Sequence, residues 1–69
     1  MQRTYLKKYR EENGIKAVEM AKRLDLSESY YNQIENGNRQ NPMDITLVSK
    51  ISAVTGMTVS DIVELEMNA

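Results

Sequence analysis

The sequence predicts an all-α fold of five short helices, because two patterns recur along the chain. Glycine stands at positions 14, 37 and 56, each time after a segment with helical spacing of its apolar residues. Glycine is favoured just past a helix C-terminus, since it adopts the left-handed conformation without strain. No stretch alternates apolar and polar residues for long enough to indicate a β-strand. The helices expected between these stops span residues 4–13, 17–24, 28–36, 45–55 and 59–65.

The first two helices differ in how they begin. The first places Leu6 and Tyr9 three residues apart, on a side that we expect to face the core. The second follows Ile15, which is positioned to pack against Met20 as a hydrophobic staple. Lys16 stands at its N-cap position, where a positive charge opposes the helix dipole. This helix therefore begins without a favourable capping side chain.

The other three helices follow a side chain that can cap them. Ser27, Asp44 and Thr58 are residue types whose side-chain oxygen accepts a bond from a free backbone N–H group. An apolar pair five residues apart brackets each start, which is the spacing of a hydrophobic staple. These pairs are Leu26 with Tyr31, Met43 with Val48, and Met57 with Ile62. Thr58 and Asp61 also approximate a capping box.

Composition excludes several classes of protein. The chain has 69 residues, which suits one small domain over residues 1–69, and it contains neither Cys nor His. A disulfide framework, a zinc site of Cys or His, and catalysis by a histidine base are therefore excluded. No apolar run approaches the length of about 18 residues that a membrane span needs. We expect a cytoplasmic protein without a cofactor, a metal or a membrane partner.

The net charge of −1 by itself discourages a nucleic-acid partner, because such domains usually carry a basic surface. The distribution of the charge is more informative than the total. Residues 1–41 contain eight Lys or Arg and six Asp or Glu, for a net charge of +2. Residues 42–69 contain one Lys and four acidic side chains, for a net charge of −3. The N-terminal part is therefore mildly basic.

A short turn joins the second and third helices, which is the geometry of a helix-turn-helix. Over residues 15–37 the chain reads IKAVEMAKRLDLSESYYNQIENG, and Pro42 follows. This segment resembles the phage repressor and Cro-like helix-turn-helix proteins, also called the XRE family. The resemblance extends from Leu6 to Val63. The residues that carry it are Ala21, Leu24, Leu26, Ser27 and the ending Ile34-Glu35-Asn36-Gly37.

The resemblance implies a compact five-helix, lambda-repressor-like DNA-binding domain, with the helix-turn-helix at about residues 16–37. It implies that the third helix lies in the major groove of double-stranded DNA. It also implies a structural ion pair between Arg10 and Glu35, because the family commonly pairs these positions.

Three features depart from the family pattern. Ala17 stands where the family usually has a Gln that contacts phosphate, so this chain lacks that side chain. Asp25 stands where the turn usually has Gly, and Asp adopts the left-handed conformation only at some cost. The register between Pro42 and the fourth helix is one residue longer than usual.

The outward side of the third helix carries short polar side chains, and Glu28, Ser29, Asn32 and Gln33 fall on it. Gln and Asn pair bidentately with adenine in the major groove, and Glu accepts a bond from cytosine N4. We therefore predict base contacts for these four residues. Glu28 has a second explanation, a favourable charge near the positive end of the helix dipole. We expect Tyr30 to pack rather than to contact DNA.

The predicted phosphate contacts flank the two ends of the helix-turn-helix. They are Lys16, Asn36, Asn38, Arg39 and Gln40. Contacts of this kind position a protein on DNA and carry no sequence information directly. Two alternatives stay open, because an imperfect helix cap would also explain Lys16 and an ordinary polar loop would look similar.

A single domain of this size covers little DNA, so we expect a homodimer on two half-sites. The predicted interface consists of Met57, Leu65 and Met67, while Val59 and Ile62 are expected to lie in the core. The segment VELEM has a second interpretation, a short strand. A further regulatory protein partner also stays open.

The leading prediction is a sequence-specific transcription regulator, a repressor that blocks polymerase as a homodimer on a pseudo-palindromic operator. The alternative is a protein-interaction module, an antitoxin or adaptor that keeps the fold with weak or no DNA binding. The low net charge, Ala17 and Glu28 favour the alternative, whereas the polar, lysine-free side of the third helix favours the regulator. An enzyme is not expected, because so small an all-helical chain offers little room for a concave pocket.

Overall fold

The computed structural model describes residues 2–68, and within that range it contains five α-helices and no strand. The all-α prediction is confirmed, and each predicted start agrees with the structure. The predicted end of α4 also agrees, and the other four ends differ by one to three residues. The helices are α1 (Thr4–Glu12), α2 (Ala17–Arg23), α3 (Glu28–Glu35), α4 (Ile45–Thr55) and α5 (Val59–Asn68).

Three side chains cap the helices where the sequence predicts caps. The Ser27 hydroxyl accepts a bond from a backbone N–H of α3 at 3.1 Å, and the Asp44 carboxylate accepts one from α4 at 2.8 Å. The Thr58 hydroxyl accepts one from α5 at 3.0 Å. Gly56 ends α4 with φ +80°, in the left-handed region that favours glycine. These bonds are local, so they define the starts of α3, α4 and α5 without any tertiary contact.

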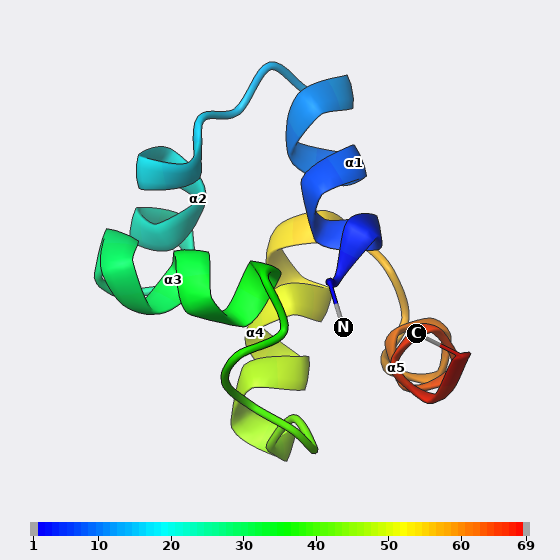
Figure 1. The fold of residues 1–69 in the computed structure, drawn as a ribbon. Coiled ribbons are helices and arrows are strands. Elements are labelled where there is room, and N and C mark those ends of the chain that lie inside the picture. Colours follow the sequence, from blue (N-terminus) through cyan, green and yellow to red (C-terminus); the bar gives the residue numbers. More distant parts are fainter. Residues whose placement is uncertain (1, 69) are drawn as a thin grey trace.

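The helices enclose one core. Figure 1 shows α2 and α3 together on one side and α5 on the other, with α4 between them and α1 above. Packing pairs α2 with α3, α4 with α5, and α1 with α3. Large apolar side chains from all five helices are buried at the centre. They include Leu6, Met20, Leu24, Tyr31, Ile34, Ile51 and Ile62.

Helix α5 corrects three expectations. The segment VELEM is helical rather than a strand, and α5 continues three residues past the predicted end at residue 65. Ile62 is buried and Glu66, one turn later, faces the same side, so the segment follows a helical period. Val59 was expected in the core but is 39% exposed, since it is the first residue of α5 and lies at the end of the helix.

Candidate nucleic-acid interface

A tight turn sets the angle between α2 and α3. Asp25 takes φ +60°, the left-handed conformation that its short polar side chain allows. The Leu26 N–H then donates to the carbonyl of Ala21 at 2.8 Å, which folds the chain back onto α2. The Ala21 side chain is buried, and its small size lets the two helices approach closely. The sequence therefore forms the helix-turn-helix without the usual glycine.

Helix α3 has one buried side and one exposed side. Tyr31 and Ile34 are buried against the core. Glu28, Ser29 and Asn32 are exposed, and Gln33 is half-buried. The four predicted base contacts thus lie together on the outward side of one short helix. Tyr30, which was expected to pack, lies half-buried against the core.

An ion pair anchors the C-terminal end of α3 to α1, as the resemblance implies. The Arg10 guanidinium donates twice to the Glu35 carboxylate, each time at 2.9 Å, and the Tyr31 hydroxyl donates to the same carboxylate at 2.6 Å. Burial favours the neutral acid, but the bonds from Arg10 and Tyr31 outweigh it and lower the pKa of Glu35. Burial and the bond to Glu35 raise the pKa of Tyr31. The triad is therefore ionised as carboxylate and guanidinium, with a neutral tyrosine.

The loop after α3 brings two predicted phosphate contacts against α3 and α4. The Arg39 Nε donates to the Gln33 Oε1 at 2.9 Å. The Gln40 amide group donates to the Tyr30 hydroxyl at 2.8 Å, and its oxygen accepts from the Asp44 N–H at 2.9 Å. Both ends of the Gln40 side chain are therefore engaged within the protein.

The other predicted phosphate contacts lie at the surface. Lys16 is exposed at the N-cap of α2 and makes no side-chain capping bond there. Asn36 and Asn38 are exposed at the end of α3 and in the following loop. The geometry leaves these three side chains accessible to a ligand.

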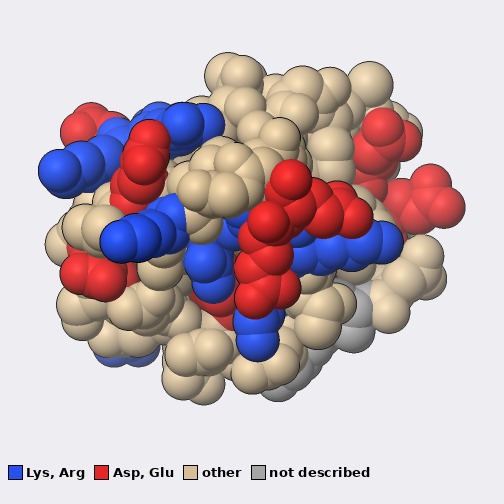
Figure 2. All heavy atoms as spheres, turned by 90° about the horizontal axis from the view of Figure 1, so that it is seen from above, with Lys and Arg blue, Asp and Glu red and all other residues tan. Residues whose placement is uncertain are grey.

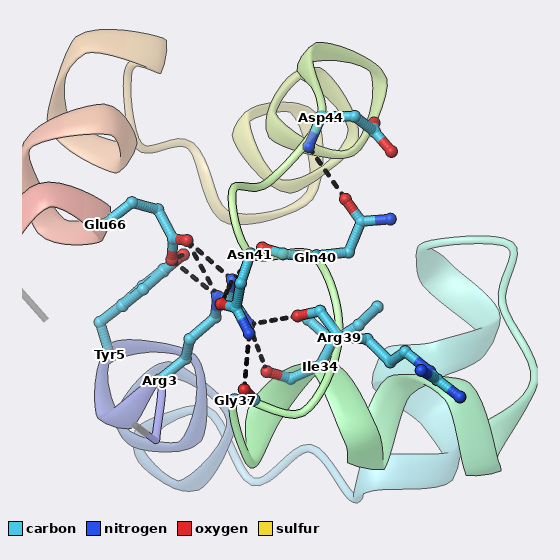
Figure 3. Close-up of polar contacts among 9 residues, drawn as sticks. All are labelled: Arg3, Tyr5, Ile34, Gly37, Arg39, Gln40, Asn41, Asp44 and Glu66. Carbon is cyan, nitrogen blue, oxygen red and sulfur yellow. Dashed lines mark hydrogen bonds and ion pairs between the residues drawn. The ribbon is translucent and has the colours of Figure 1, made fainter.

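One functional residue escaped the sequence reasoning. Arg3 is fully buried, and its guanidinium donates to backbone carbonyls at the end of α3 and in the following loop (Figure 3). The bond to Ile34 measures 2.7 Å and the bond to Arg39 measures 2.9 Å; a further bond reaches the Gln40 carbonyl. The Asn41 side-chain oxygen also accepts from Arg3, at 3.0 Å. A single buried side chain thus defines the path of the loop.

The same arginine ties this loop to the last helix. The Arg3 Nε donates to the Glu66 carboxylate at 2.8 Å, and the Tyr5 hydroxyl donates to that carboxylate as well. Burial and the Glu66 bond raise the pKa of Tyr5. No pattern in the sequence marks Arg3, because its partners lie 31 to 63 residues away and most of them are backbone carbonyls. Arg3 is a positioning residue for the interface.

A helix-turn-helix family model matches residues 6–62 of the chain. The chain belongs to this helix-turn-helix family. The match includes the α2–α3 turn, the exposed side of α3 and the Arg10–Glu35 pair, whereas Arg3, Tyr5 and Glu66 lie outside it. The protein is therefore a DNA-binding transcription regulator of the XRE kind. No curated protein and no solved structure shows a significant match to the chain.

One face of this helix-turn-helix protein carries a mixture of positive and negative side chains. Figure 2, seen from above relative to Figure 1, shows Lys and Arg side chains interleaved with Asp and Glu. Non-specific attraction to DNA depends on clustered positive charge, so this side of the regulator contributes little of it.

Residues 2–68 include no cluster of three or more acidic, Cys or His side chains that could hold a metal ion. None of the five described helices is both long and apolar enough to cross a membrane.

Proposed function

We propose that the protein is a sequence-specific repressor that binds a pseudo-palindromic operator as a homodimer, with α3 in the major groove. The observation that carries this proposal is the exposed polar side of α3, held in place at its C-terminal end by two buried or nearly buried arginines. Arg10 fixes Glu35 of α3 itself, and Arg3 fixes the carbonyl of Ile34 together with the next loop. A firmly anchored reading helix favours specificity, because its backbone is already ordered and fixes the positions from which the side chains meet the bases.

The proposed base contacts are Glu28, Ser29, Asn32 and Gln33. Their side chains offer hydroxyl, amide and carboxylate groups, which pair with base edges in the major groove. Lys16, Asn36, Asn38, Arg39 and Gln40 are proposed to position the protein on the phosphates. For Gln40 the proposal requires its backbone or a rearranged side chain, because its amide already bonds Tyr30 and Asp44.

The proposed dimer surface lies on α5 and on Met57, two residues before its start. Met67 is 81% exposed and Leu65 is 37% exposed, so both apolar side chains are open to a partner. Met57 and Leu65 line a shallow hollow together with Asp61, Glu64 and Asn68. A second copy that covers this surface would remove the apolar side chains from water and present two reading helices to adjacent major grooves. Repression then follows by occlusion of polymerase.

Binding-site selection from random duplex DNA tests the proposed function. We expect enrichment of a two-fold symmetric sequence whose half-sites lie about one helical turn apart. With Lys16 and Arg39 as the cationic contacts of each protomer, the logarithm of the affinity should fall with that of salt with a slope of roughly −3 to −4. A selection that enriches no sequence at low salt contradicts the proposal and favours the protein-interaction module.

The dimer surface gives a separate prediction. Leu65→Glu places a charge in the proposed interface, so we expect the variant to sediment as a monomer and to bind the full operator at least about tenfold more weakly. Its affinity for an isolated half-site should stay within about twofold. Ser60→Glu is the matched control, because it adds the same charge to an exposed position of α5. If the Leu65→Glu variant forms dimers as readily as the unaltered protein, Leu65 does not belong to the interface.

A further inference from the structure

The side chains of Gln33 and Arg39 form a pair on the exposed surface beside α3. The Arg39 Nε donates to the Gln33 Oε1 at 2.9 Å, across six residues of chain. The backbone of both residues is fixed independently: the Arg39 carbonyl accepts from the buried Arg3 at 2.9 Å, and the Gln33 carbonyl accepts from the Asn38 N–H at 2.8 Å. In Figure 3 the Arg39 side chain extends away from Arg3, which leaves its guanidinium free to reach Gln33.

This bond determines which end of the Gln33 amide is available. A guanidinium carries only donors, so it must bond the amide oxygen and cannot bond the amide nitrogen. The nitrogen, with its two N–H donors, is left for a ligand. Adenine needs both ends of a glutamine amide, because it offers an acceptor at N7 and a donor at N6. The remaining lone pair of Oε1 lies beside a positive charge, which disfavours the approach of the adenine amino group.

Guanine presents the complementary edge. Its N7 and O6 atoms are both acceptors, and arginine and lysine pair with them more often than with any other base edge. The amide nitrogen of Gln33 and the terminal nitrogens of Arg39 together offer donors only, with one net positive charge. We propose that Gln33 and Arg39 read one base pair as a unit, and that the unit selects guanine where Gln33 alone would select adenine.

This inference rests on the proposed function and makes it more specific. It gives Arg39 a contact with a base instead of a phosphate, and it changes the base expected opposite Gln33 from adenine to guanine. The other proposed base contacts, Glu28, Ser29 and Asn32, do not depend on it. The salt slope does, because with Lys16 as the single cationic phosphate contact of each protomer it falls to roughly −2.

The test is binding-site selection with the full chain and three variants. Arg39→Ala removes the donor that holds the Gln33 oxygen, and Gln33→Ala removes the amide. Arg23→Ala is the matched control, because Arg23 is also an exposed arginine with one side-chain partner, Glu19 at 3.0 Å. The bonds of Arg39 and Gln33 to Arg3 and Asn38 use backbone atoms, so both variants keep them. Thermal melts verify that each variant folds.

We expect the unaltered protein to prefer guanine over adenine at one position of each half-site by about 5- to 100-fold. Gln33→Ala should lose the preference at that position, Arg39→Ala should change it to adenine, and Arg23→Ala should leave it unchanged. The inference is overturned if the unaltered protein selects adenine there, or if Arg39→Ala weakens binding to all sequences equally. If the unaltered protein enriches no sequence at all, the proposed function itself fails, which is a different outcome.

Discussion

Replacing Arg3 with alanine is expected to destabilise the protein by about 3–5 kcal/mol, because breaking a buried ion pair strands the remaining charge. The change leaves the Glu66 carboxylate, whose side chain is 14% exposed, without its cationic partner. It also removes the donor from three backbone carbonyls of the α3 end and its loop. A core of this size rarely supplies more than about 3–5 kcal/mol in total, so most of the variant should be unfolded at 25 °C. Urea unfolding followed by circular dichroism measures the loss.

Two control variants test whether the loss of stability comes from the buried contacts of Arg3. Arg3→Lys keeps the charge but has a single ammonium in place of a planar guanidinium, so it should recover only part of the stability. Arg23→Ala, which breaks an exposed pair with Glu19, should change the free energy of unfolding by less than about 0.5 kcal/mol. An Arg3→Ala variant as stable as Arg23→Ala would show that the loop and α5 do not depend on Arg3.

Replacing Glu35 is expected to have the second large effect on the free energy of unfolding, and this effect depends on pH. At pH 7 we expect Glu35→Ala to cost about 3 kcal/mol, because Arg10 loses its partner at a site where both side chains are at most 15% exposed. The pKa of Glu35 is lowered in the folded protein, so its contribution is present above the unfolded value of about 4.3. The contribution is lost as the pH falls through the folded pKa. Urea titrations between pH 7 and pH 3 follow this change.

Glu35→Gln separates the charge from the shape of the side chain. The gap in unfolding free energy between the unaltered protein and Glu35→Gln should be largest near pH 7 and should narrow below about pH 4. Tyr31→Phe removes only the hydroxyl bond to Glu35 and should cost about 1 kcal/mol. A gap that stays constant from pH 7 to pH 3 would contradict a lowered pKa for Glu35.

The helices of this protein could be predicted closely because their signals are local. Ser27, Asp44 and Thr58 each bond a backbone N–H three residues away, so the spacing in the sequence contains the whole interaction. The exposed side of α3 follows from helical periodicity in the same way. The Arg10–Glu35 pair spans 25 residues and was expected only through the resemblance to a family. Its geometry, with Tyr31 as a third member, required the structure.

By itself, the sequence determined the fold class, the starts of all five helices and the polar side of the reading helix. It did so because helix caps, staples and periodicity act over three to five residues. Only the tertiary structure decided that Arg3 is buried, that it connects the loop after α3 to Glu66 of α5, and that Arg39 holds the oxygen of Gln33. It also decided that Val59 is exposed and that α5 continues to Asn68. The physical reason is that an arginine bonds whichever acceptors the folded chain brings to it, and distant acceptors leave no pattern beside it in the sequence.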